Sequence, residues 1–114
     1  KEYDATLADA AKLAASKAKS YANDKAGYDA LNVELSLTLD KIKGLSAGGD
    51  AAALAKIRGE EAEIRTRLKM SSAKLRVSQE ISDAAGKRRA IEDKKVSSVR
   101  AALQEAVSLA EKIS

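Results

Sequence analysis

Several residue types are missing from this 114-residue chain, and each absence excludes a class of structure or chemistry. There is no proline, where an average usage of about 5% predicts roughly six residues. Histidine, cysteine, phenylalanine and tryptophan are also absent, and tyrosine occurs only three times. A β-sandwich or α/β fold needs β-branched and aromatic residues in its strands and proline or glycine in its turns. The composition therefore argues against a fold built on sheets.

The same absences argue against catalysis. Without histidine or cysteine the chain has no general base that titrates near neutral pH, no thiolate nucleophile and no usual zinc ligand set. Gly44, Gly48 and Gly49 follow a predicted helix and lack the Gly-Lys-Ser/Thr ending of a phosphate-binding loop. We expect no enzyme activity, no catalytic residue, no cofactor and no metal site.

The chain also lacks a long apolar run and an initiator methionine, and these absences concern membrane insertion and the possibility of a longer parent protein. No apolar run approaches 18 residues, so we expect no membrane span, and the start of the chain does not resemble a signal peptide. The chain begins with Lys1, which leads us to expect a single helical domain, residues 1–114, excised from a longer protein. Because the chain has no cysteine, its sequence does not indicate an oxidising or a reducing compartment.

What the chain does contain is typical of helices. Alanine occurs 24 times, and most other positions are leucine, serine or charged residues. Alanine, leucine, lysine, arginine and glutamate lose least on entering a helix. Leucine, isoleucine and valine together number only 23, so the core is thin and must rely on close approach of helices over alanines. The predicted class is all-α, with an elongated shape.

A seven-residue apolar period marks the first predicted helix, residues 4–43. The repeating positions are Leu7, Ala14, Tyr21, Tyr28, Leu35 and Ile42. This period is the signature of a coiled-coil seam. Gly44 is suited to the left-handed position that ends a helix, and residues 44–50 form the only strong loop signal.

Asp50 is a good N-cap for a second helix, whose apolar seam is Leu54, Ile57, Ile64, Leu68 and Leu75. Folding about the loop predicts an antiparallel hairpin, with Tyr28 beside Leu68. An unbroken second helix would extend well past the start of the first, because residues 50–113 span about 96 Å and residues 4–43 about 60 Å.

Both predicted helices carry a second apolar face. On the second helix it comprises Met70, Val77, Ile81 and Ala84. The chain after residue 90 adds a wide apolar face: Ile91, Val96, Val99, Leu103, Val107, Leu109 and Ile113. We therefore expect a turn or kink around Ser82–Arg89, at Gly86, which makes helices at about 50–84 and 88–113 and a three-helix bundle. The alternative is a kinked continuous helix whose apolar face is covered by a second copy of the chain.

Six residues are candidates for binding a partner. Arg58, Arg65, Lys69 and Arg76 project within about 40° of one another on a helix. Such a basic stripe attracts phosphates, lipid headgroups or lipopolysaccharide, although a solvated face neutralised by neighbouring acids is the simpler interpretation. Tyr21 and Tyr28 share a face of the first helix; tyrosine is a favoured interface anchor, and it also fills seams.

Part of the chain resembles a known family. Residues 21–107 look like the alanine- and lysine-rich antiparallel hairpins of colicins and S-type pyocins. The segments concerned are Leu39-Asp40-Lys41-Ile42-Lys43-Gly44, Ala51-Ala52-Ala53-Leu54 and Glu63-Ile64-Arg65-Thr66-Arg67-Leu68. In that family such hairpins bind an outer-membrane receptor or surface polysaccharide, or assist translocation. The energy-coupling box, the nuclease signature and the pore-forming hairpin are absent, and no binding residue carries over.

The resemblance implies a secreted bacteriocin segment that binds a receptor or assists translocation. The alternative is a cytoplasmic scaffold or assembly protein, of a phage or secretion system, that oligomerises through residues 91–113. A third hypothesis is nucleic-acid binding through the basic stripe. It is the least favoured, because helical nucleic-acid binders usually add stacking aromatic residues.

Overall fold

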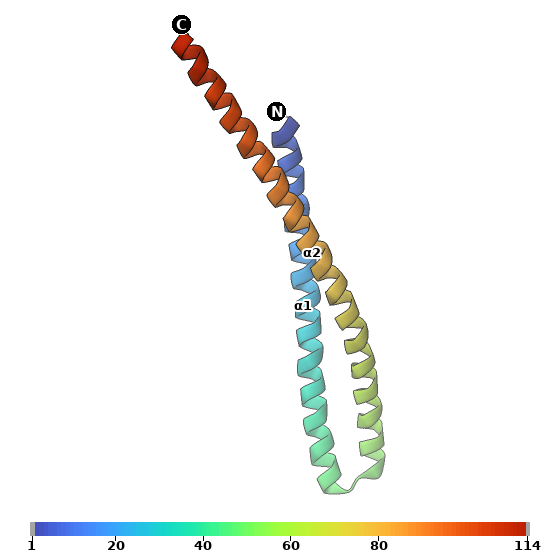
Figure 1. Cartoon of the computed structure of the whole chain (residues 1–114). Helices are drawn as coiled ribbons and strands as arrows, with labels where there is room; N and C mark the ends of the chain where they lie inside the picture. The colour runs from blue at the N-terminus through green and yellow to red at the C-terminus, as the bar shows by residue number, and fades with distance from the viewer. Residues whose placement is uncertain (1, 114) are drawn as a thin grey trace. The chain divides into compact units, whose positions relative to one another are not determined.

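The computed structural model describes residues 2–113, and in that range the chain forms two α-helices and no strand. Helix α1 spans Glu2–Gly48 and helix α2 spans Ala51–Ile113. The ribbon turns back on itself between them, so that the two helices run in opposite directions (Figure 1). The predicted all-α class and antiparallel hairpin are confirmed. The described chain is a two-helix hairpin and not the predicted three-helix bundle.

The turn between the helices is tighter than the sequence predicts. Helix α1 continues through Gly44 to Gly48, and Gly49 alone takes the left-handed conformation, with φ of 74°. The amide of Gly49 donates to the carbonyl of Leu45 at 3.1 Å, which closes the end of the helix. The prediction that α1 ends at residue 43 is therefore wrong. A single glycine weakens a helix by only about 1 kcal/mol, and the later Gly48-Gly49 pair provides a better exit.

The start of α2 follows the prediction. The Oδ1 atom of Asp50 accepts a hydrogen bond from the amide of Ala53 at 3.1 Å. The carbonyl of Asp50 accepts the first helical bond, from Leu54, at 3.0 Å. Asp50 is thus the N-cap, because it satisfies an amide that has no partner inside the helix.

The two helices pack as two compact units. Unit 1 joins residues 2–19 of α1 with residues 80–113 of α2, and unit 2 comprises residues 20–79. In each unit the helices contact along a seam of buried and half-buried residues. In unit 2 the seam of α1 comprises Tyr21, Asp24, Tyr28, Leu31, Leu35, Thr38, Ile42 and Leu45; that of α2 comprises Leu54, Ile57, Glu61, Ile64, Leu68, Ser71, Leu75 and Ser78. The alternating three- and four-residue spacing is that of a coiled coil.

Unit 1 has a narrower seam. Ala10 of α1 and Ala85 and Val96 of α2 are buried. Alanine at these positions lets the two backbones approach closely, which compensates for the small number of large aliphatic side chains. Residues 101–113 of α2 are all exposed, and in Figure 1 this end of α2 continues past the start of α1.

The predicted turn at Ser82–Arg89 is wrong, because α2 passes through this region as continuous α-helix. Ser82, Ala85 and Glu92 keep the seam spacing across this region, so an unbroken helix retains the packing of Ala85 against α1. A helix break would sacrifice several backbone hydrogen bonds, whereas Gly86 costs only about 1 kcal/mol relative to alanine. The helix is therefore continuous here, as in the alternative interpretation, whose kink and covering second copy stay predictions.

Register in unit 2 differs slightly from the prediction. Asp24 of α1 contacts both Lys74 and Ser78 of α2. This pairing places Tyr28 about level with Ser71, roughly one helical turn from the predicted neighbour, Leu68. The cause is the turn: since α1 is extended to Gly48, α2 begins to run back later than a loop at residues 44–50 implies.

Candidate functional site

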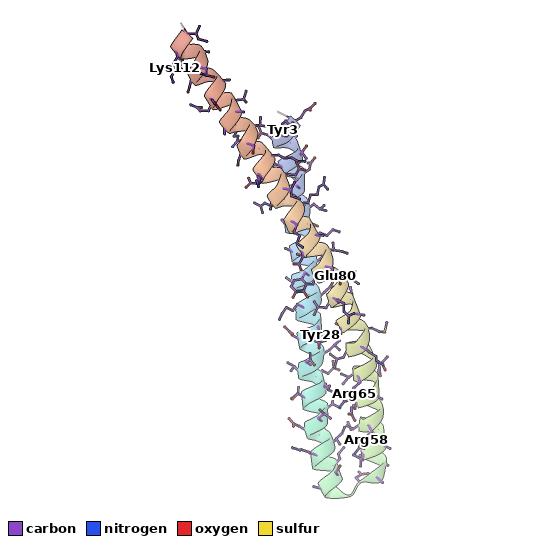
Figure 2. All side chains as sticks on the ribbon, in the orientation of Figure 1. Tyr3, Tyr28, Arg58, Arg65, Glu80 and Lys112 are labelled. Carbon is purple, nitrogen blue, oxygen red and sulfur yellow. The ribbon has the colours of Figure 1, made fainter. Side chains whose placement is uncertain are left out.

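The two candidate tyrosines lie in the seam of unit 2. Tyr21 and Tyr28 are half-buried and share the side of α1 that carries the other seam residues. Figure 2 shows Tyr28 on α1 at a height where α2 runs alongside. Much of each side chain therefore serves the contact between the two helices. Their role as anchors for a partner stays a prediction.

The predicted basic stripe is partly neutralised within its own helix. Glu61 lies 3.9 Å from Arg58 and 2.8 Å from Arg65, measured between guanidinium nitrogen and carboxylate oxygen. The Glu61 side chain is only 16% exposed, and it occupies a seam position. Figure 2 shows the two arginines on the same stretch of α2. Lys69 and Arg76 are exposed and make no ion pair with any residue from 2 to 113, so most of the excess positive charge lies in the second half of the stripe.

A polar site interrupts the seam of unit 2. Ser78 of α2 donates a hydrogen bond to Asp24 of α1, and the Lys74 ammonium lies 3.4 Å from the same carboxylate. The hydrogen bond from Ser78, followed by that from Lys74 and its charge, lowers the pKa of Asp24 below its ordinary value, against the opposing effect of burial. Asp24 also borders a groove of about 500 Å³ with Gly27, Met70 and Ser71.

Sequence reasoning missed this site. Asp24 occupies the seven-residue repeat of Ala10 and Leu31, where an acidic residue is unexpected. A charged residue at a seam position is a recognised device for specifying register. The irregularity in the repeat was therefore a usable signal.

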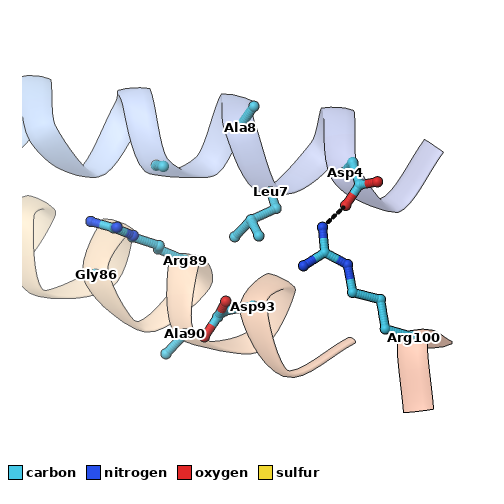
Figure 3. A pocket seen from close by; sticks show the side chains of 9 residues that line it. Asp4, Leu7, Ala8, Gly86, Arg89, Ala90, Asp93 and Arg100 are labelled. Atoms are coloured by element: carbon cyan, nitrogen blue, oxygen red, sulfur yellow. Dashed lines mark hydrogen bonds and ion pairs between the residues drawn. The ribbon is translucent and has the colours of Figure 1, made fainter. Parts of the chain in front are cut away.

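One flank of unit 1 carries a groove of about 600 Å³ between the helices. Figure 3 shows Leu7 pointing from α1 toward α2, with Arg89 and Asp93 on the opposite wall. Asp4 and Arg100 pair across it at 3.1 Å. Both partners of this ion pair are exposed, so its contribution to stability is small, at most about 1 kcal/mol.

Large apolar side chains are exposed outside both seams. In unit 2, Val33 and Leu37 of α1 and Met70 and Val77 of α2 are exposed, Met70 by 70%. In unit 1 the exposed set is Tyr3, Leu13, Ile81, Ile91, Leu103, Val107, Leu109 and Ile113. The second apolar face predicted on α2 is therefore uncovered in the described structure.

Between residues 2 and 113 there is no group of three or more acidic side chains arranged to hold a metal ion. No helix in the same range is long and apolar enough to cross a membrane.

Comparison of the chain with protein-family profiles, with curated proteins and with solved structures finds no match. The comparisons thus give no support to the resemblance to colicin and pyocin hairpins, which stays a prediction.

Proposed function

We propose that this chain is a non-enzymatic helical binding module that acts by contact with another protein. The observation that carries the proposal is the exposure of large apolar side chains outside the seam. Met70 and Val77 are seven residues apart, so they project from the same side of α2, and both are more than half exposed. Exposed apolar residues at this spacing can pack against the apolar face of a partner helix.

Two narrower contexts follow from the sequence. One is a receptor-binding or translocation segment of a colicin-like bacteriocin, which is supported by sequence resemblance. The other is an assembly protein that oligomerises through residues 91–113. The exposure of Leu103, Val107, Leu109 and Ile113 supports the second context, because these residues form an apolar surface at the end of α2.

Affinity capture from an extract of the source organism tests the binding function. The immobilised chain is compared with a Met70→Glu/Val77→Glu variant. The matched control is Ser72→Glu/Gln79→Glu, which places two charges with the same seven-residue spacing at exposed positions on another side of α2. Circular dichroism of all three proteins checks that the helices are intact.

The proposal expects proteins that are retained by the wild type and by the control but lost with the Met70/Val77 variant. Equal retention by all three proteins would contradict it, because binding would then be independent of the apolar surface. The proposal would also be contradicted if the wild type retained no protein from the extract and the chain itself stayed monomeric at all concentrations.

A further inference from the structure

The last part of α2 is an amphipathic segment with an uncovered apolar arc. Residues 100–113 are exposed, and at 100° per residue their large aliphatic side chains gather on about 160° of the circumference. The members of this arc include Ala102, Leu103, Ala106, Val107, Leu109 and Ile113. A single partner helix covers a narrower stripe than this, so the arc is suited to a groove formed by two helices.

Unit 1 presents such a groove elsewhere on its surface. Leu13 of α1 and Ile81 and Ala84 of α2 line a groove of about 280 Å³ between the two helices, and Lys17 and Arg88 complete its walls. Ile81 is 44% exposed although its side chain is aliphatic. The spacing from Ile81 to Ala84, Arg88 and Ile91 is three, four and three residues, so these residues form one side of α2.

The groove is lined by bases, and the terminal segment, whose own charges cancel (Arg100, Glu105, Glu111 and Lys112), places a carboxylate beside its apolar arc. No acidic residue lines the groove, and neither Lys17 nor Arg88 makes an ion pair with any residue from 2 to 113. The terminal segment carries Glu105 at the margin of its apolar arc. A groove that is apolar in the middle and basic at its edges favours a segment that carries a carboxylate beside aliphatic side chains.

We infer that the occupant of this groove is the terminal segment, residues 100–113, of a second copy of the chain. The inference rests on the proposed binding function and names its partner. Because groove and segment lie on the same helix, two copies related by a two-fold axis exchange segments reciprocally, with their α2 helices antiparallel. Each contact between groove and terminal segment then occurs twice in the dimer.

The register of this pairing follows from its charges. Placing Arg88 of one copy opposite Glu105 of the other sets Ala84 level with Leu109 and Ile91 level with Ala102. Each of these pairs sets a large side chain against a small one, which lets two helices interdigitate. The antiparallel overlap runs from about residue 81 to residue 112 of both copies, or roughly 48 Å.

Sedimentation equilibrium over a wide concentration range tests the pairing. The wild type is expected to show a monomer–dimer equilibrium. Ile81→Glu in the groove and Leu109→Glu in the segment are each expected to weaken the dimer by about tenfold or more, because each replaces an aliphatic side chain at the contact with a charge that loses its hydration there. Both positions are exposed in the single chain, Leu109 by 53%, so the helices themselves remain intact by circular dichroism.

A charge exchange provides the sharpest readout. Arg88→Glu and Glu105→Arg are each expected to weaken the dimer by about tenfold, since each removes two symmetric ion pairs. The double variant is expected to regain wild-type association. Lys56→Glu, at an exposed position of α2 outside the overlap, is the matched control and is expected to leave the dimer unchanged.

Two results would overturn the inference. A wild type that stays monomeric at all concentrations would exclude the second copy, yet capture that depends on Met70 and Val77 would still support the proposed function. A dimer that is insensitive to Ile81→Glu and Leu109→Glu, or a charge exchange that fails to restore association, would place the interface elsewhere.

Discussion

Asp24 of α1 accepts a hydrogen bond from Ser78 of α2, a residue that lies 54 positions later in the chain. This contact and the nearby Lys74 ammonium join the two helices of unit 2 at a polar point in an otherwise largely aliphatic seam. Where aliphatic residues repeat every seven positions, the helices can shift by one heptad and still bury them. The same shift would separate Asp24 from Ser78 and leave both groups without their hydrogen bond. Asp24 therefore contributes to register as well as to stability.

The first prediction concerns the pH dependence of this contact. Because the folded state lowers the pKa of Asp24, the carboxylate stabilises the fold above the ordinary aspartate pKa of 3.8. This stabilisation is lost as the pH falls through the still lower pKa of the folded state. We expect the free energy of unfolding of the wild type to exceed that of Asp24→Asn at neutral pH, and the difference to shrink below about pH 4. Urea unfolding at a series of pH values measures both.

Ser78→Ala provides the companion measurement, because the hydrogen bond from Ser78 is the largest cause of the lowered pKa. We expect this variant to reduce the same pH dependence. A difference between wild type and Asp24→Asn that is constant from neutral to acidic pH would show that the contact does not act through the charge.

The second prediction compares two glycines. Gly49 has a positive φ, so Gly49→Ala is expected to reduce the free energy of unfolding by about 1 kcal/mol. Gly86 is helical, and a β-carbon added there has no atom within 4 Å. Gly86→Ala is therefore expected to increase the free energy of unfolding by up to about 1 kcal/mol. Thermal unfolding of the two variants measures these opposite signs, and destabilisation by Gly86→Ala would argue against a continuous α2.

The third prediction concerns the N-cap of α2. Asp50→Ala removes the acceptor of the Ala53 amide and is expected to lower the free energy of unfolding by about 1 kcal/mol. Asp50→Asn keeps an acceptor of the same geometry and should remain close to the wild type. Denaturant unfolding compares the three proteins, and equal losses in both variants would show that capping is not the cause.

The fourth prediction separates the seam from the exposed apolar surface. Ile64 is 5% exposed, so Ile64→Ala is expected to lower the free energy of unfolding by about 2–5 kcal/mol, through lost burial and a cavity. Met70→Ala removes a comparably large side chain that is 70% exposed, and it is expected to change the free energy of unfolding by less than about 0.5 kcal/mol. Urea unfolding under conditions where the chain is monomeric measures both. Similar losses for the two variants would mean that Met70 is covered in the isolated chain.

Prediction from the sequence succeeded where the physical signal is local. Asp50 was recognisable as an N-cap because its side chain acts on an amide three residues away. The seven-residue period from Leu7 to Ile42 identified the side of α1 that carries the seam, since periodicity alone determines which residues share a helix face. The candidate residues were predicted by the same logic, and their roles toward a partner remain predictions.

Prediction failed where two nearly equal free energies compete. Gly44 and Gly86 were predicted to end a helix, yet both lie inside helices. A glycine inside a helix costs only about 1 kcal/mol, and contacts elsewhere along the seam outweigh it. Such contacts depend on which residues of the other helix lie opposite, and local sequence does not reveal this.

The sequence by itself thus determined that the described chain is helical, where α2 begins and which side of α1 faces its partner, because helix propensity, capping and periodicity act over a few residues. Only the tertiary structure decided that α2 continues through Gly86, that Asp24 pairs with Ser78 and Lys74, and that Ile81 and Leu109 remain exposed. Each of these features depends on the register of α2 against α1. That register results from the sum of many weak contacts between residues that are far apart in the chain.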